Sequence, residues 1–473
     1  MIGRRKAIDE LTRAYESTQS ELVVLYGRRR VGKTYLVNEV FGRKFSFHHS
    51  GLKGGNKSQQ LKQFRLSLRQ QGHWRCPALH DWQEAFFELG NFLAQTHESR
   101  KVVFIDEMPW MDTFRSDFVM AFEGFWNGWA SFRTDILLIV CGSATSWVIN
   151  KVLHNKAGLH NRVSARIRLQ PFTLNECEQY VAERGLGMDR FQIMECYMAF
   201  GGVAYYWSLL KRGRSAEQNI NDLFFAAQDG LKDEFNELYD SLFCNSENYK
   251  AIVMKLRERS SGMQREDILK ALGKVSGGDL TRRLEELEEC GFIRSYRNGN
   301  QPRNGTIYQL IDPFTLFYFT FQDGFQNPSS DYWMQRVSPA VKSNWRGHSF
   351  ERVCLGHVDQ IKRALGISGV STEVYAWQGR AQSDDESGAQ IDLLIDRNDG
   401  VVNVCEMKYA KSPYVIDKDE ADKLRVRLDM FAKRTGTKKI LHLTLVSPCG
   451  LEHKGHWGIV QSQVTMDDLF CAM

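Results

Sequence analysis

One octapeptide near the start of the chain constrains the fold more than any other stretch. Residues 27–34 read Gly-Arg-Arg-Arg-Val-Gly-Lys-Thr and match the pattern G-x-x-x-x-G-K-[ST] in full. An apolar run at 22–26 comes directly before this loop, and the residues from 35 onward can continue a helix. A strand, a glycine-bounded turn and a helix N-terminus surround an anion with backbone N–H groups. The sequence therefore predicts an α/β domain that binds a nucleoside triphosphate.

Each part of this loop has a predicted role. Gly27 and Gly32 permit backbone angles and a close approach that a Cβ atom would obstruct. Lys33 is expected to bridge the β- and γ-phosphates, and the Thr34 hydroxyl is expected to ligate Mg²⁺. The residues of the loop predicted to contact the nucleotide are Gly27, Arg28, Arg29, Arg30, Val31, Gly32, Lys33, Thr34 and Tyr35. The three arginines either contribute positive charge around the phosphates or are ordinary charged surface residues.

The whole-chain composition sets the broad class of protein. The length of 473 residues exceeds one ordinary core, so about two to four domains are expected. No run approaches the apolar length of a membrane span. The N-terminus lacks an apolar signal core, and the ten cysteines contain no C-x-x-C pair. These two features predict reduced thiols in a cytoplasmic protein. The net charge of +5 permits nucleic-acid binding without requiring it.

A second strand ends in acids that hydrolysis would need. Strand-like runs at 22–26, 102–105 and 136–140 alternate with helical stretches, as in a parallel α/β sheet. Asp106 and Glu107 follow the middle run directly. Asp106 is expected to hold the Mg²⁺ shell, and Glu107 to orient and deprotonate the attacking water. The alternative is a strand that ends in a solvated acidic turn.

Residues near two further strand ends complete the predicted nucleotide site. Ser143 follows the run at 136–140 and is the candidate to bond the γ-phosphate or its water, although serine is also an ordinary turn residue. Residues 161–168 contain Arg162, Arg166 and Arg168. One of these is a candidate arginine finger that stabilises charge on the transferring phosphoryl group. The alternative, which is equally well supported, is that the three arginines form salt bridges on a solvated strand.

Together these motifs resemble the archaeal-type ATPase family, a branch of the AAA+/STAND-like P-loop ATPases. The matching segments are Ile2-Gly3-Arg4, the loop at 27–34, Asp106-Glu107, Cys141-Gly142-Ser143 and the Gly-Gly-x-x-x-Tyr pattern at 201–206. The resemblance implies ATP as the ligand, Arg4 near the nucleotide base, Ser143 as the sensor and Arg162 as the arginine after the sensor strand. It also implies a helical lid at 173–245. The lid motif usually carries Pro where this chain has Ala204, a change expected to alter local stiffness more than nucleotide binding.

Residues 247–311 have the pattern of a winged helix. Helices are expected from 251, over 265–272 and over 280–287, with Asp279 as the N-cap of the third. Strands at 291–296 and 306–310 then bracket a wing-like turn at 298–300. The third helix of such modules enters the DNA major groove. The residues that would contact DNA are Arg282, Arg283, Arg297 and Arg303.

The charge of this segment leaves its partner open. It contains twelve Lys and Arg against nine Asp and Glu. The acids at 285, 286, 288 and 289 would repel phosphate from the C-terminal half of the third helix. A structural or protein-contacting winged helix is therefore as well supported as a DNA-binding one.

A second chemically suggestive group lies near the C-terminus. Two apolar strands, from 391 and from 402, are joined by a polar turn at 396–400 and indicate a hairpin. Glu406 and Lys408 share one strand face because they are two residues apart, and Asp392 on the partner strand can meet them. Two carboxylates and the Met407 carbonyl would bind Mg²⁺, while Lys408 would position a water or steady the phosphate charge. The alternative is a set of cross-strand salt bridges.

This second group resembles the active site of the PD-(D/E)xK restriction-endonuclease-like superfamily. Asp392, Glu406 and Lys408 stand at the matching positions, and Glu351 matches the acid that the first helix often supplies. The predicted metal ligands of the chain are thus Thr34, Asp106, Glu351, Asp392 and Glu406. The expected domains are a P-loop ATPase domain at 1–172, the lid at 173–245, a winged helix at 246–322, a linker around 323–331 and a nuclease-like α/β domain at 340–473.

Two functions follow from these expectations. The first is an ATP-gated, Mg²⁺-dependent DNA nuclease, in which Lys33, Glu107, Arg162, Glu406 and Lys408 are catalytic. The second is an ATP-driven switch or regulatory binding protein whose nuclease-like domain is inactive. The expected partners are ATP, Mg²⁺, DNA and further copies of the chain, with no membrane.

Overall fold

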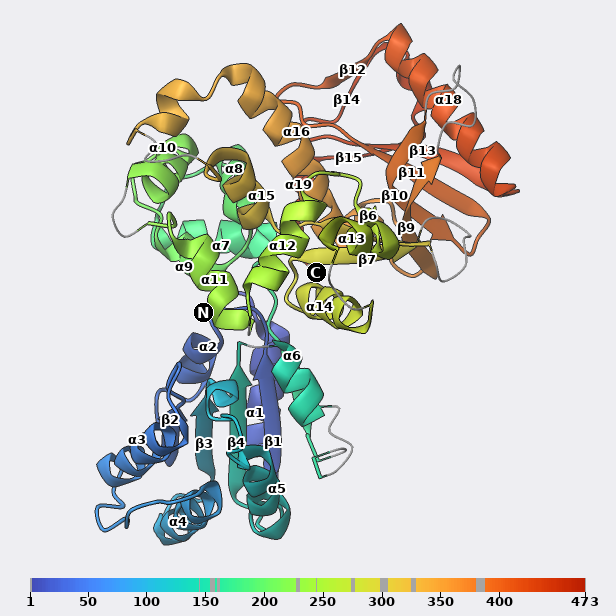
Figure 1. Cartoon of the computed structure of the whole chain (residues 1–473). Helices are drawn as coiled ribbons and strands as arrows, with labels where there is room; N and C mark the ends of the chain where they lie inside the picture. Colours follow the sequence, from blue (N-terminus) through green and yellow to red (C-terminus); the bar gives the residue numbers. More distant parts are fainter. Residues whose placement is uncertain are drawn as a thin grey trace. The chain divides into compact units, whose positions relative to one another are not determined.

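A computed structural model describes most of the chain as two compact units (Figure 1). The first unit contains Met1–Pro171 and Asp240–Cys244, and the second contains Phe172–Tyr239 and Asn245–Met473. The described residues are 2–143, 145–153, 158–159, 162–226, 230–243, 245–273, 277–297, 305–324, 329–379 and 388–472. Within these ranges, no helix has both the length and the apolar character needed to cross a bilayer.

The first unit is built on a parallel sheet of five strands in the order β2-β3-β4-β1-β5. The strands are β1 (Glu21–Tyr26), β2 (Phe47–Ser50), β3 (Lys101–Asp106), β4 (Ile136–Gly142) and β5 (Ala165–Arg168). The three runs predicted to be strands form β1, β3 and β4, so the parallel α/β fold is confirmed. Strand β2 was not predicted because its sequence, Phe-His-His-Ser, contains no apolar run.

Helices cover both faces of this sheet because β1 is apolar on both. The helices are α1 (Arg5–Glu16), α2 (Lys33–Val40), α3 (Lys57–Gln70), α4 (Trp82–Gln95), α5 (Phe118–Gly128) and α6 (Thr145–Val148). Val24 belongs to the core formed with α3, α4 and α5, whereas Leu25 belongs to the core formed with α1 and α2. Alternate residues of a strand face opposite ways. The carboxyl ends of β1, β3 and β4 consequently open at one edge of a rigid layer.

The second unit begins with the segment predicted to be a helical lid. Its helices are α7 (Leu174–Arg184), α8 (Arg190–Phe200), α9 (Ala204–Ser208), α10 (Ala216–Asn221) and α11 (Glu234–Leu242). Two of them, α8 and α10, form ion pairs with α16 (Pro339–Gly356). The Arg346 guanidinium donates to buried Glu195 and, at 2.9 Å, to Glu217, which also pairs with Lys342 at 3.0 Å. The helical segment therefore shares its packing with the C-terminal half of the chain.

Next come the elements expected of a winged helix. They are α12 (Glu247–Leu256), β6 (Met263–Gln264), α13 (Arg265–Leu272), α14 (Gly277–Glu289), β7 (Ile293–Arg297) and β8 (Thr306–Leu310), with an antiparallel sheet in the order β6-β8-β7. The predicted N-cap is wrong, because α14 begins at Gly277 and places Asp279 inside its first turn. There Asp279 pairs with Arg282 at 2.6 Å and with Arg283 at 2.5 Å. The predicted wing at 298–300 and Arg303 lie outside the described residues.

The C-terminal part is a mixed sheet in the order β15-β13-β11-β10-β9. Its strands are β9 (Thr372–Gly379), β10 (Ala389–Arg397), β11 (Val401–Met407), β13 (Ile440–Val446) and β15 (Ser462–Val464). The predicted hairpin is confirmed as antiparallel β10 and β11, and β11 pairs in parallel with β13. Helix α18 (Lys418–Thr435) packs on this sheet through residues such as Phe431.

A buried histidine joins the C-terminal end of α16 to the start of α7. The His357 Nε2 atom accepts the Leu174 N–H at 3.1 Å, and Nδ1 donates to the Val353 carbonyl at 2.8 Å, so the ring must be neutral. Burial lowers the pKa of His357 to about 4, although the bond to Val353 acts in the opposite direction. An unfolded chain would bind this proton near pH 6.5.

Acidification should therefore destabilise the second unit through His357. Its contribution is complete above pH 6.5 and is lost as the pH falls to 4, because only the unfolded chain takes up the proton in that window. The shift corresponds to about 3 kcal/mol of unfolding free energy. Urea unfolding of wild type and His357→Gln between pH 7 and pH 4 measures it, and the variant should show a flatter pH dependence. Parallel curves for the two proteins would contradict the prediction.

Candidate functional site

The phosphate-loop motif forms the connection between β1 and α2. Gly27 has φ +145°, and a Cβ atom there would lie 2.3 Å from the Leu169 carbonyl oxygen. Gly32 has φ +96° and caps α2, whose first residue is Lys33. Both glycines therefore occupy backbone positions that other residues rarely adopt. The loop has the predicted combination of strand, glycine turn and helix N-terminus.

Lys33 is held inside the loop. Its side chain is buried, and its ammonium donates to the carbonyls of Gly27 at 2.9 Å and Arg28 at 3.0 Å, with the Ser143 hydroxyl at 3.4 Å. The loop carbonyls thus fix a positive charge at its centre. A polyphosphate offers stronger acceptors than carbonyls because charge-assisted hydrogen bonds are the stronger kind.

The start of α2 and the end of β3 bring two hard oxygen donors together. The Thr34 hydroxyl donates to Asp106 Oδ2 at 2.7 Å, and Asp106 Oδ1 accepts the Glu107 N–H at 2.9 Å. Mg²⁺ prefers one or two protein oxygens together with phosphate oxygens and waters. A hydroxyl and a carboxylate next to the phosphate loop fit that requirement.

Glu107 and Ser143 meet across β3 and β4. The Ser143 N–H donates to Glu107 Oε2 at 3.1 Å, and its hydroxyl donates to the other carboxylate oxygen. Glu107 has φ +46°, an uncommon conformation for a residue other than glycine. Such strain is often found at functional sites. The predicted base and the predicted sensor therefore form one hydrogen-bonded pair.

The remaining predicted nucleotide contacts surround the loop. The Arg4 guanidinium donates to the Gln170 carbonyl and, at 3.2 Å, to the Val31 carbonyl, which ties the chain start to the loop. Arg28 and Val31 are buried, Arg29 and Arg30 are partly exposed, and Thr34 and Tyr35 are exposed. Their contacts with a nucleotide stay predictions.

Arg162 lies at the opposite end of the sheet from the loop. Strand β5 runs parallel to β1 with Ala165 beside Val23 and Arg168 beside Tyr26. Arg162 is exposed and precedes the start of β5, so at least the length of that strand, about 10 Å, separates it from the loop. Its role as an arginine finger stays a prediction.

The second predicted site is a cavity of about 870 Å³ in the C-terminal part. Its walls come from α16, β10, β11 and α18, and include all four predicted residues, Glu351, Asp392, Glu406 and Lys408. An irregularity in the pairing of β10 with β9 falls between Ile391 and Leu394. Such bulges re-aim side chains, and this one lies at Asp392.

The charged side chains of the cavity lie close enough to shift one another's pKa. Burial raises the pKa of Asp392, and the nearby charge of Glu351 raises it further. The Lys408 ammonium lies 3.1 Å from Glu406 Oε1 and 3.0 Å from Glu420 Oε1. Burial opposes the charge on Lys408, but these two carboxylates raise its pKa. A cation bound beside Asp392 and Glu351 would offset the repulsion between the two carboxylates. A divalent metal ion would meet this need.

Sequence reasoning missed the polar residues that bond to the side chains of Asp392, Glu406 and Lys408. Glu420 forms an ion pair with Lys408, as Glu406 does. Arg427 donates to the second oxygen of Glu406, and Gln390 donates to Asp392. Strand periodicity could have found Gln390, because it lies two residues before Asp392. Glu420 and Arg427 come from α18, and no local pattern connects them to Glu406.

Comparisons with known proteins bear mainly on the N-terminal part. Residues 1–210 match the model of a family described as "ATPase domain predominantly from Archaea". This match supports, for residues 1–210, the resemblance to archaeal-type ATPase domains that the motifs indicate. The family match ends at residue 210 and does not extend to the C-terminal part, whose nuclease-like interpretation stays a prediction.

Two curated relatives come from the archaeon Methanocaldococcus jannaschii. The uncharacterized protein MJECL04 is 23% identical over 441 residues, 91% of each chain. The uncharacterized ATP-binding protein MJ0423 is 37% identical over 43 residues, 9% of this chain and 73% of that protein.

Two solved structures are also similar to the chain. The Walker-type ATPase PABY2304 of Pyrococcus abyssi has 16% identity and a TM-score of 0.48, and the match covers 67% of this chain and 95% of that chain. The ORC2 protein of Aeropyrum pernix has 15% identity and a TM-score of 0.41, over 66% of this chain and 92% of that chain.

Proposed function

We propose that the chain binds and hydrolyses ATP and uses the nucleotide to control Mg²⁺-dependent DNA cleavage by its C-terminal part. The observation that carries the cleavage proposal is the cavity shared by Glu351, Asp392, Glu406 and Lys408. These residues come from three separate elements and meet in one place. The ATPase proposal rests on the phosphate loop and on the family match of residues 1–210.

In the ATPase domain, four side chains divide the work of hydrolysis. Lys33 would hold the β- and γ-phosphates, and Thr34 with Asp106 would hold Mg²⁺, which supplies charge neutralisation when bound. Glu107 would accept a proton from the attacking water. Because Ser143 holds both carboxylate oxygens of Glu107, it is placed to link the state of the γ-phosphate to the position of the base.

In the C-terminal cavity, carboxylates from two strands and one helix would hold a metal. Asp392, Glu406 and the Met407 carbonyl would be its ligands, with Glu351 on the α16 side, and Mg²⁺ would supply Lewis-acid activation of water and phosphate when bound. Lys408 keeps its proton because Glu406 and Glu420 flank it. Its ammonium would therefore orient a water or stabilise charge on a phosphate oxygen.

Substitutions in this cavity test the cleavage proposal. Asp392→Ala and Lys408→Ala should each lower the rate of DNA cleavage by about a thousandfold, since one removes a metal ligand and the other a positive charge at the scissile phosphate. The measurement is the cleavage of plasmid and single-stranded DNA with Mg²⁺ or Mn²⁺, with and without ATP. EDTA should abolish it.

Exposed residues of α18 provide matched controls. Asp429→Ala and Lys433→Ala remove the same charges from the outer surface and should leave cleavage unchanged. If wild type leaves both DNA forms intact with either metal, in the presence and absence of ATP, the cleavage proposal is wrong.

A second candidate function is an ATP-driven switch or regulatory binding protein with an inactive C-terminal cavity. The observation in its favour is that Lys408 and Arg427 both pair with Glu406, so a metal must displace at least one internal cation. Nucleotide binding without DNA cleavage by wild type would favour this function.

A further inference from the structure

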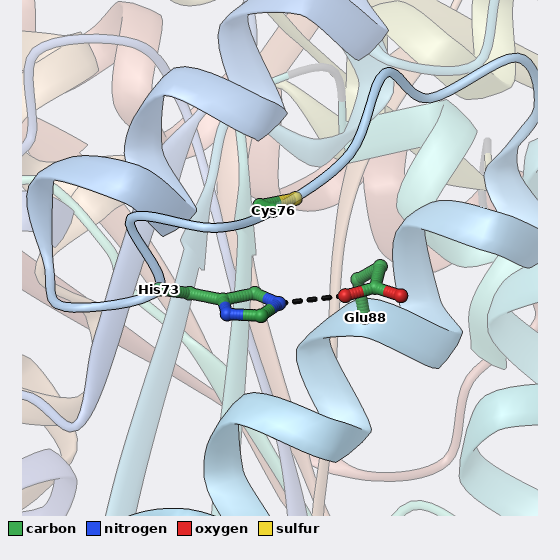
Figure 2. A group of neighbouring side chains, drawn as sticks. All are labelled: His73, Cys76 and Glu88. Atoms are coloured by element: carbon green, nitrogen blue, oxygen red, sulfur yellow. Dashed lines mark hydrogen bonds and ion pairs between the residues drawn. The ribbon is translucent and has the colours of Figure 1, made fainter.

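The connection between α3 and α4 gathers three side chains of metal-binding type. Figure 2 shows the His73 ring and the Glu88 carboxylate facing each other, with Cys76 beside them. His73 Nε2 lies 2.6 Å from Glu88 Oε2, and the candidate donor atoms of the three residues all lie within 4.8 Å of one another. None of these residues belongs to the nucleotide loop or to the C-terminal cavity.

Hydrogen bonds of the main chain fix the turn that carries His73 and Cys76. Gly72 has φ +123°, and the His73 N–H returns to the Leu68 carbonyl at 2.9 Å, which ends α3 in a tight turn. The Cys76 N–H donates to the His73 carbonyl at 2.9 Å, and the Arg65 guanidinium donates to the Cys76 carbonyl at 3.1 Å. The H-x-x-C turn is thus ordered by main-chain bonds that no metal has to provide.

Packing also orients the side chains. The His73 ring stacks on Phe92 of α4 with centroids 6.0 Å apart, so its Nε2 atom is directed at Glu88. Cys76 is 2% exposed, while the His73 and Glu88 side chains are 17% and 16% exposed. The thiol therefore lies on the inner side of the group, and the imidazole and carboxylate lie nearer to solvent.

We propose that His73, Cys76 and Glu88 bind one Zn²⁺ ion, with water as the fourth ligand. Thiolate and imidazole ligands favour zinc over Mg²⁺ or Ca²⁺, which require oxygen donors. Zinc ligands lie about 2.0 to 2.3 Å from the metal, so the donors must end up about 3.5 Å apart. The widest pair must therefore close by about 1 Å and the His73–Glu88 contact must open by a similar amount. Side-chain rotations of this size leave the turn intact.

Bound zinc would fasten the α3–α4 connection to the middle of α4. Burial raises the pKa of the Cys76 thiol, and Glu88 raises it further, whereas the nearby Arg65 and Arg69 act in the opposite direction. Zinc binding replaces the thiol proton. The site therefore competes with protons, and its affinity should increase with pH. This inference is independent of ATP hydrolysis and of DNA cleavage.

Metal analysis and cobalt substitution of the full-length protein test the proposal. Protein purified under reducing conditions should contain about one Zn²⁺ per chain, and Co²⁺ should produce a thiolate-to-metal charge-transfer band in the near ultraviolet. Cys76→Ser should remove that band, and Glu88→Gln should weaken metal retention at least tenfold. Cys471→Ser removes an exposed thiol outside the group and should change neither result.

Two outcomes would overturn the inference. One is wild-type protein that retains no zinc and gives no thiolate band with Co²⁺, which would leave an ordinary His73–Glu88 ion pair. The other is a band that persists in Cys76→Ser. Far-ultraviolet circular dichroism and ATP binding of each variant separate loss of the metal from loss of the fold, and Glu88→Gln keeps the size of the side chain.

Discussion

Replacing Lys33 by alanine is expected to lower the affinity for ATP by about a thousandfold. The Lys33 ammonium is buried at the centre of the loop and donates to two loop carbonyls. Removing one partner of a buried charge interaction costs about 3 to 5 kcal/mol, and each 1.4 kcal/mol is a tenfold change. Isothermal titration with ATP and Mg²⁺ measures the effect.

Two further variants make this result specific. Lys62→Ala removes an exposed lysine from α3 of the same unit and should leave the affinity unchanged. Glu107→Gln should bind ATP and lose turnover, because the amide cannot accept the proton of the attacking water. An unaltered affinity in Lys33→Ala would contradict the assignment of the loop as the nucleotide site.

Replacing Gly202 by alanine is expected to destabilise the second unit by about 3 kcal/mol or more. An added Cβ atom would lie 1.9 Å from the Phe172 carbonyl oxygen and 2.7 Å from the Phe172 nitrogen. The Phe172 N–H also donates to the Gly202 carbonyl at 2.6 Å. Two backbone segments therefore touch here, and neither can move aside as a flexible side chain would.

Thermal and urea unfolding of Gly202→Ala measure this cost. Gly278 provides the matched control, because it lies in the first turn of α14 and a Cβ atom there meets nothing within 4 Å. Gly278→Ala should be neutral or slightly stabilising. Equal stabilities for the two variants would show that the backbone contact at Gly202 relaxes without cost.

The sequence predicted the parts of the fold that depend on local patterns. The strands at 22–26, 102–105 and 136–140 are apolar runs, and the glycines at 27 and 32 fix a turn, so β1, β3, β4 and the phosphate loop were predictable. The hairpin of β10 and β11 followed from two apolar runs and a polar turn. These features need no information from distant residues.

Features made by distant residues were not predictable. Strand β2 is a strand because it pairs with β3, although three of its four residues are polar. The pairing irregularity at Asp392 arises from register against β9. Arg427 reaches Glu406 from the helix that crosses the sheet. The group of His73, Cys76 and Glu88 contains only one cysteine, and Glu88 comes from α4, so no local motif indicates it.

Because ion pairs join the helical segment to α16, a shortened chain must include α16 to keep the helical segment folded as in the full-length protein. A chain cut after residue 322 would lose Lys342, Arg346 and His357 together. Glu195, which is 5% exposed in the full chain, would lose its guanidinium partner together with the helix that packs on α8. Truncation to isolate the ATPase domain would therefore destabilise the helical segment that follows it. The kinetics of ATP hydrolysis should be measured on the full-length chain.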